Sequence, residues 1–96
     1  MLKGGRRLRA RLVDVRFVTS SLGHMRIGVL VPKYGFTAVR RNRLKRRLRE
    51  LARQRLLGVA QSFDIVIRAR REAYAASFAQ LSDDIDVVAP QLSTVA

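Results

Sequence analysis

The sequence predicts a small α+β sandwich in which helices pack on a β-sheet. Apolar and polar residues alternate in the first third of the chain, whereas apolar residues recur every three or four positions within 44–55 and 78–88. A run rich in β-branched residues at 63–69 adds a further strand. The length of 96 residues fits one domain over 1–96, with flexible ends expected at 1–5 and 90–96.

The first strands are indicated by a change of phase. Apolar residues occupy even positions from Leu8 to Leu12 and odd positions from Val13 to Phe17. Because side chains alternate between the two faces of a strand, this change requires either a bulge or two short strands that meet near position 11. We expect a turn at 19–24, followed by a strand that ends at Pro32.

A basic helix is expected next, with Thr37 as its N-cap and Gly58 as its end. At about 100° per residue, one face of this helix is largely leucine, and we expect that face to pack on the sheet. The other face carries charged and amide side chains, with Arg41 and Lys45 at its flank. The face expected to pack on the sheet consists of Leu44, Leu48, Leu51, Ala52 and Arg55.

The 63–69 run is expected to form a largely buried strand before a second helix. Ser77 and Gln80 have the spacing of a capping box, which predicts the start of that helix. Its apolar residues share one face, and Pro90 is expected to end it. This core-facing stripe consists of Phe78, Leu81, Ile85 and Val88.

Positive charge is concentrated in the first half of the chain. Residues 1–55 carry 17 Lys or Arg against two acids, a net charge of +15, whereas residues 56–96 carry three against five, a net charge of −2. Nine basic residues, eight of them Arg, lie between positions 40 and 55. This density costs repulsion that a polyanion relieves, and Arg favours bidentate contacts with phosphate. A nucleic-acid backbone is the expected partner; a solvated helix without a partner and a membrane surface are the alternatives.

Composition also excludes several kinds of site. The chain has no cysteine for disulfides or thiolate metal sites, and no apolar run of signal-peptide or membrane-span length, so we expect a cytoplasmic protein. His24 is the single histidine and lies in an expected turn, and no Walker or zinc-ligand pattern occurs. Asp83, Asp84 and Asp86 are expected on the solvated face of the last helix. We therefore predict neither a catalytic residue nor a metal site. We predict that Tyr34 is an exposed aromatic residue that stacks on bases.

Four segments of the sequence, and the order in which they occur, resemble the protein component of bacterial ribonuclease P. The most specific is the Arg-Asn-Arg sequence at 41–43, which is followed by Lys-Arg and then by Arg-Glu at 49–50 and lies just after a Gly-Val strand. The resemblance covers roughly residues 4–88. Its segments are 26–33 (RIGVLVPK), 38–50 (AVRRNRLKRRLRE), 64–70 (DIVIRAR) and 77–81 (SFAQL).

The resemblance implies an αβββαβα fold with a left-handed β–α–β connection, against the usual handedness. It also implies a subunit of an RNA-catalysed endoribonuclease that is not catalytic alone. Such a subunit binds the catalytic RNA and the 5′ leader of precursor tRNA, while Mg²⁺ acts through that RNA to release the mature 5′ end. No cofactor, membrane or small-molecule substrate is expected for the protein. A non-catalytic ribosomal or RNA-assembly binding protein is the alternative, and a protein-only nuclease is a third reading.

The family motif also implies individual site residues. Val13, Val15 and Tyr34 are expected to line the leader cleft, and Tyr34 stands where the family usually has a second lysine. The family usually begins with a further helix that forms one wall of this cleft. This chain starts near the turn after it. We therefore expect either that the true start lies upstream of the given one, or that the first helix is lacking and the cleft is half open. The implied RNA contacts are Lys33, Arg41, Asn42, Arg43, Lys45, Arg46 and Arg49.

Overall fold

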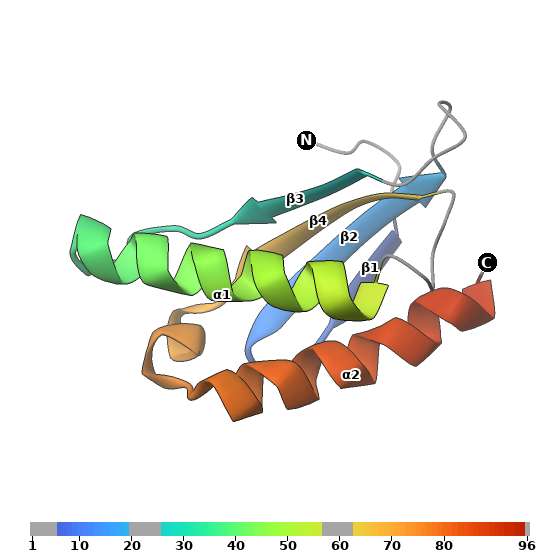
Figure 1. Cartoon of the computed structure of the whole chain (residues 1–96). Helices are drawn as coiled ribbons and strands as arrows, with labels where there is room; N and C mark the ends of the chain where they lie inside the picture. Colours follow the sequence, from blue (N-terminus) through green and yellow to red (C-terminus); the bar gives the residue numbers. More distant parts are fainter. Residues whose placement is uncertain (1–5, 20–25, 57–62, 96) are drawn as a thin grey trace.

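A four-stranded sheet is covered on one face by two helices in the computed structural model, which describes residues 6–19, 26–56 and 63–95 (Figure 1). The predicted α+β class is confirmed. The elements are β1 (Arg6–Arg9), β2 (Val13–Thr19), β3 (Arg26–Leu30), α1 (Ala38–Leu56), β4 (Phe63–Ala69), the 3₁₀ turn η1 (Arg71–Ala75) and α2 (Phe78–Val95).

The sheet is mixed and has the strand order β1-β2-β4-β3. β2 pairs antiparallel with both β1 and β4, so that Val15 lies opposite Leu8 on one side and Ile67 on the other. The change of phase near position 11 is a tight connection between two strands, in which the Ala10 amide donates to the Val13 carbonyl at 2.9 Å. The prediction of two short strands is therefore confirmed over that of a bulge.

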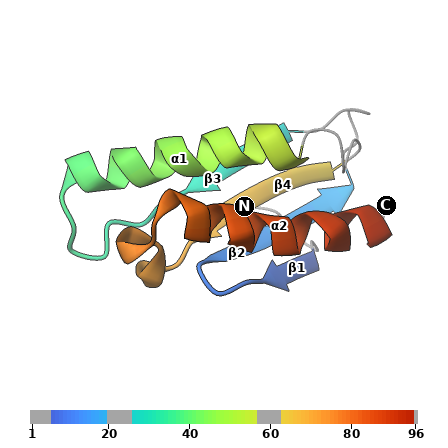
Figure 2. The ribbon, with the colours of Figure 1, turned by 60° about the horizontal axis from the view of Figure 1, so that its bottom comes forward.

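α1 connects two parallel neighbours, β3 and β4. In Figure 1 both strands point to the left, β4 lies below β3, and α1 runs in front of them. This arrangement makes the connection left-handed, as the family resemblance implied and against the usual rule. Figure 2 shows that α1 and α2 lie side by side on the same side of the sheet.

The core lies between the sheet and the two helices. Alternate residues of β2 and β4 face it, including Val13 and Ile67, which are fully buried. The leucine face of α1 is buried as predicted, except that Arg55 instead reaches α2, where its guanidinium binds Asp86. Phe78 is 40% exposed, so its predicted place in the core is wrong, because the core contacts of α2 begin one turn later. The buried residues of α2 are Leu81, Asp84, Ile85, Val88 and Leu92.

The two ends of α2 differ in how well the sequence predicted them. The capping box is confirmed: Ser77 Oγ accepts from the Gln80 amide at 3.1 Å, and Gln80 Oε1 accepts from the Ser77 amide at 2.9 Å. The predicted end at Pro90 is wrong, and the residues expected as a flexible end are helical as far as Val95. Burial of Leu92 favours this continuation despite the hydrogen bond that a proline removes. Residues 1–5, His24 and Gly58 lie outside the described residues.

Asp84 corrects a further expectation. It was predicted on the solvated face of α2, but it is 7% exposed. Its carboxylate accepts hydrogen bonds from three successive backbone amides of the β1–β2 connection, at 3.2, 2.8 and 3.1 Å. This connection presents amides that have no strand partner, and the carboxylate satisfies them. The three donors are Arg11, Leu12 and Val13.

Candidate nucleic-acid interface

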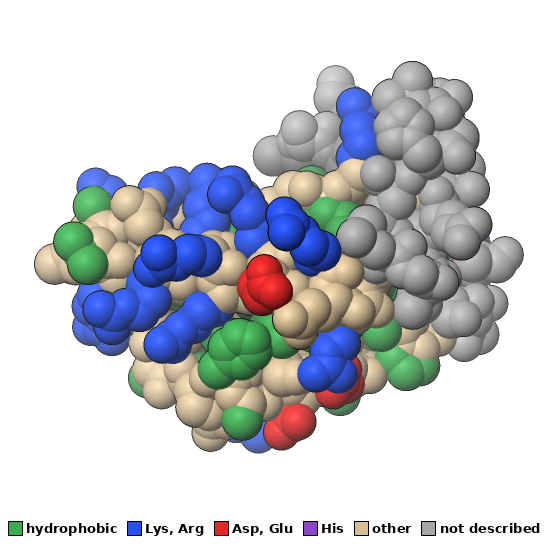
Figure 3. All heavy atoms as spheres, viewed as in Figure 1, with side chains coloured by type: hydrophobic (Ala, Val, Ile, Leu, Met, Phe, Trp, Pro, Cys, Tyr) green, Lys and Arg blue, Asp and Glu red, His purple; other side chains and the backbone are tan. Residues whose placement is uncertain are grey.

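The outer face of α1 presents its charge away from the core. Thr37 caps the helix as predicted, because its Oγ1 accepts from the Arg40 amide at 3.2 Å. The exposed side chains then follow helical spacing, and Figure 3 shows Lys and Arg gathered over this helix. Within the described residues, no ion pair neutralises them. We name this the helix surface: Asn42, Arg43, Arg46, Arg49 and Arg53.

Other arginines of α1 are engaged within the protein. Arg40 lies 4.4 Å above the Phe36 ring and donates to the Tyr74 carbonyl at 3.3 Å. Arg41 donates from Nε to the Val31 carbonyl at 2.8 Å. Arg55 pairs with Asp86 of α2 at 2.9 Å. These three side chains hold α1 against its neighbours, which distinguishes them from the arginines of the helix surface in a way that the sequence alone does not show.

The residues predicted to contact RNA are accordingly not equivalent. The structure brings Asn42, Arg43, Arg46 and Arg49 together on the helix surface. Arg41 and Lys45 are half-buried at its flank, and Lys33 is exposed on the segment before the helix. Their contacts with RNA stay a prediction.

The loop before α1 is built around stacked aromatic rings. Tyr34 has a left-handed φ of 51°, followed by Gly35 at 86°. The Tyr34 hydroxyl donates to the Ala69 carbonyl at 3.3 Å, and its ring meets Tyr74 edge-on. Tyr74 in turn stacks on Phe36 with centroids 4.2 Å apart. Tyr34 is therefore half-buried, and the prediction that it is a freely exposed aromatic is wrong.

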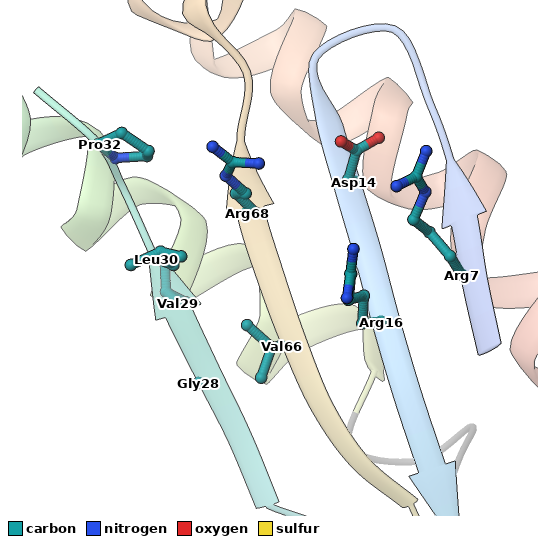
Figure 4. A pocket seen from close by; sticks show the side chains of 9 residues that line it. All are labelled: Arg7, Asp14, Arg16, Gly28, Val29, Leu30, Pro32, Val66 and Arg68. Carbon is teal, nitrogen blue, oxygen red and sulfur yellow. The ribbon is translucent and has the colours of Figure 1, made fainter. Parts of the chain in front are cut away.

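The sheet face opposite the helices contains a hollow of about 600 Å³ that is lined in part by arginines (Figure 4). Its rim carries Arg7, Arg16 and Arg68, which are exposed and make no ion pair with a described residue. An adjoining hollow of about 270 Å³ shares Asp14 and Arg68 and adds further arginines. We name the larger one the sheet hollow; it is lined by Arg7, Asp14, Arg16, Gly28, Val29, Leu30, Pro32, Val66 and Arg68.

Two of the residues expected at the leader cleft do not lie on an open face of the sheet. Val13 and Val15 are fully buried under the helices, so they cannot line an open cleft. The hollow is instead lined by Asp14 and Arg16, which occupy the opposite phase of the same strand. Alternation identifies the two faces of a strand, and polarity indicates which one is solvated. That signal was present at positions 14 and 16.

At the β3 edge of the sheet, one arginine is already neutralised. Arg26 donates to both carboxylate oxygens of Asp64, at 2.9 and 2.7 Å, which ties β3 to β4. These hydrogen bonds, together with the charge of Asp64, raise the pKa of Arg26 above its usual value. In the part of the chain that the structure describes, no cluster of metal-ligating side chains occurs, and no helix is long and apolar enough to cross a membrane.

Known proteins share the sequence and the fold of this chain. The family model described as ribonuclease P matches residues 1–92. The chain belongs to the ribonuclease P protein family. The solved RNase P protein from Thermotoga maritima has the same fold, with a TM-score of 0.81 at 28% identity, over 93% of this chain and 84% of that one.

Relatives in this family share more than a third of the residues. The ribonuclease P protein component of Thermus scotoductus is 38% identical over 84 residues, which cover 88% of this chain and 49% of that protein. The component of Acidothermus cellulolyticus is 38% identical over 88 residues, which cover 90% and 73%. The chain thus spans about half the length of the Thermus relative.

Proposed function

We propose that this chain is the protein subunit of ribonuclease P and promotes endonucleolytic removal of the 5′ leader from precursor tRNA. The observation that carries the proposal is the helix surface, whose arginines make no ion pair with a described residue, in a chain that the ribonuclease P family model matches over residues 1–92. The catalytic RNA, with Mg²⁺ bound to it, supplies the phosphodiester chemistry, and the protein supplies binding. This role places the protein in the cytoplasm.

The helix surface is proposed to bind the catalytic RNA. Guanidinium groups of Arg43, Arg46 and Arg49 are free to make bidentate contacts with phosphates, and the Asn42 amide offers both donors and an acceptor. Lys33 and Lys45 add charge at the edges of this surface. Arg41 contributes mainly by fixing the start of the helix through the Val31 carbonyl.

The sheet hollow is proposed to hold the single-stranded leader. Arg7, Arg16 and Arg68 suit the phosphates, and Val66 and Leu30 offer an apolar floor for base faces. The side chains that line the hollow lie on the sheet face opposite the helices (Figure 4). The protein would therefore contact the catalytic RNA and the leader with different surfaces.

The first test is cleavage of a precursor tRNA by a bacterial ribonuclease P RNA at low Mg²⁺, with and without this chain. We expect stimulation by the wild-type protein and its loss in the triple variant Arg43→Ala/Arg46→Ala/Arg49→Ala. Arg55→Ala is the matched control, because it removes a charge from the same helix at a side chain paired with Asp86. Tight RNA binding without stimulation would favour the alternative, an RNA-assembly or ribosomal binding protein.

A second test isolates the leader. Precursors with a long leader and with a single-nucleotide leader are compared in the same reaction. We expect Arg16→Ala/Arg68→Ala to abolish the advantage of the long leader while stimulation of the short-leader substrate persists. Equal losses on both substrates would contradict the assignment of the sheet hollow to the leader.

A further inference from the structure

A carboxylate lies among the arginines of the sheet hollow. Asp14 is opposite Arg9 on β1 and opposite Arg68 on β4 in the strand register. Its side chain is 16% exposed, and Figure 4 shows it beside Arg16 and near Arg7. An acid here opposes phosphate binding, so its position calls for an explanation other than general charge.

Asp14 also has unused hydrogen-bonding capacity. Among the described residues, its Oδ1 is the one buried side-chain polar atom without a hydrogen-bond partner. The Arg9 Nε lies 3.5 Å away, which is an ion-pair distance longer than a good hydrogen bond. The Arg9 side chain is 61% exposed and free to move aside. Buried acceptors are normally satisfied, so a donor that displaces Arg9 would find an acceptor at this oxygen.

We propose that Asp14 reads the base of a nucleotide in the sheet hollow by accepting a hydrogen bond from its exocyclic amino group. This inference rests on the proposed leader-binding role. Cytosine N4 and adenine N6 are donors that a carboxylate accepts, whereas uracil presents the O4 acceptor, which the carboxylate repels. The surroundings suit a flat base: Gly28 has no side chain, and Leu30 is 51% exposed beside Val66.

The test measures binding of short oligocytidine and oligouridine RNAs by fluorescence anisotropy. These bases differ at the edge that Asp14 would contact. We expect the wild-type protein to prefer oligocytidine by about tenfold, the discrimination typical of one good base contact. Asp14→Asn should bind both RNAs more tightly, because a negative charge is lost. Its preference should fall to about one, because the new amide both donates and accepts.

Two controls isolate the base contact. Glu72→Gln removes an acid beside Arg70 in the same basic region and should leave the preference unchanged. The ribose 2′-hydroxyl is also a donor, but it is common to both RNAs and would give no preference between them. The same ratio is measured with oligodeoxycytidine and oligodeoxyuridine to show that the bases alone produce it. The preference should persist in the deoxy pair. Its loss there would show that the bases alone do not produce the preference and would overturn the proposal.

The remaining outcomes distinguish the base contact of Asp14 from leader binding by the sheet hollow. Equal wild-type affinity for both RNAs would overturn the Asp14 assignment and leave leader binding intact. A preference that survives in a folded Asp14→Asn protein, checked by circular dichroism, would overturn it as well. Failure of the wild-type protein to bind either RNA would instead remove the leader-binding surface, and with it this inference.

Discussion

Two aspartates of this chain use a carboxylate in opposite ways. Asp84 is buried and fully engaged, because three backbone amides of the β1–β2 connection donate to it. Asp14 lies on the exposed side of the same hairpin and keeps an oxygen without a donor. The first holds the fold together, and the second is the acceptor that we propose for a nucleotide base.

Removal of the Asp84 carboxylate should be costly. Asp84→Ala leaves three buried or half-buried amides without an acceptor, and we expect the free energy of unfolding to fall by about 2–3 kcal/mol. Urea denaturation measures this change. Asp83→Ala is the matched control, because Asp83 is exposed on the same turn and should change stability by no more than about 0.5 kcal/mol. Equal effects of both variants would contradict the role given to Asp84.

The two groups of arginines on α1 should differ in how salt affects RNA binding. Each phosphate contact releases counterions, so Arg46→Ala should reduce the slope of log affinity against log salt by about 1. Arg40→Ala should leave the slope nearly unchanged, because its guanidinium is engaged with Phe36 and Tyr74. Titrations of the catalytic RNA at several salt concentrations measure both slopes. The reverse order would show that Arg40 contacts phosphate.

At the scale of elements, α1 is held at its start by a stack of side chains. Arg40 covers Phe36, Phe36 covers Tyr74, and the Tyr74 hydroxyl donates to the Pro32 carbonyl at 2.7 Å. Through Tyr74, η1 thereby fixes the loop that connects β3 to α1. The orientation of the helix surface depends on this loop as well as on the leucine face.

Tyr74 variants should separate the ring from its hydroxyl. Tyr74→Phe removes one hydrogen bond, and we expect a loss of about 1 kcal/mol in the free energy of unfolding. Tyr74→Ala also removes the stack and should cost about 3 kcal/mol. Thermal or urea unfolding measures both. If Tyr74→Ala were no worse than Tyr74→Phe, the ring stack would have no part in holding the loop.

Features that depend on neighbouring residues in the chain were predictable at this scale. The leucine face of α1 and the capping box at Ser77 and Gln80 follow from local spacing, and both are present. Non-local features were not predictable: Asp84 finds its donors 71 to 73 residues away along the chain. Pro90 was expected to end α2, as proline usually does, but the burial of Leu92 in the core favours continuation of the helix. The candidate site shows the same difference. The local motif predicted the residues of the helix surface, whereas it did not predict that the helices bury the β2 face that carries Val13 and Val15.

At the scale of the whole molecule, the net charge of +13 opposes compaction. The acids of the described residues relieve it only locally, as in the pairs Arg55–Asp86 and Arg26–Asp64. The helix surface and the rim of the sheet hollow remain unpaired on opposite sides of the sheet. Polyanions should therefore stabilise the folded state by binding to it.

Inorganic sulfate should raise the melting temperature. We expect an increase of about 4 °C or more at sulfate concentrations well above its dissociation constant, whereas chloride at equal ionic strength should give less. The triple variant Arg43→Ala/Arg46→Ala/Arg49→Ala should show a smaller sulfate effect. Differential scanning fluorimetry measures these shifts. An equal response to sulfate and chloride would mean that simple screening accounts for the stabilisation.

The position of β4 between β2 and β3 has a consequence for biosynthesis. Among the described strands, β3 pairs with β4 alone, and β4 comes last along the chain. While the nascent polypeptide emerges from the ribosome, β3 and the basic α1 have no sheet on which to assemble until about two thirds of the chain has been made. Completion of the sheet therefore requires β4, and a product that stops before β4 would carry the arginines of α1 without the sheet that orients them.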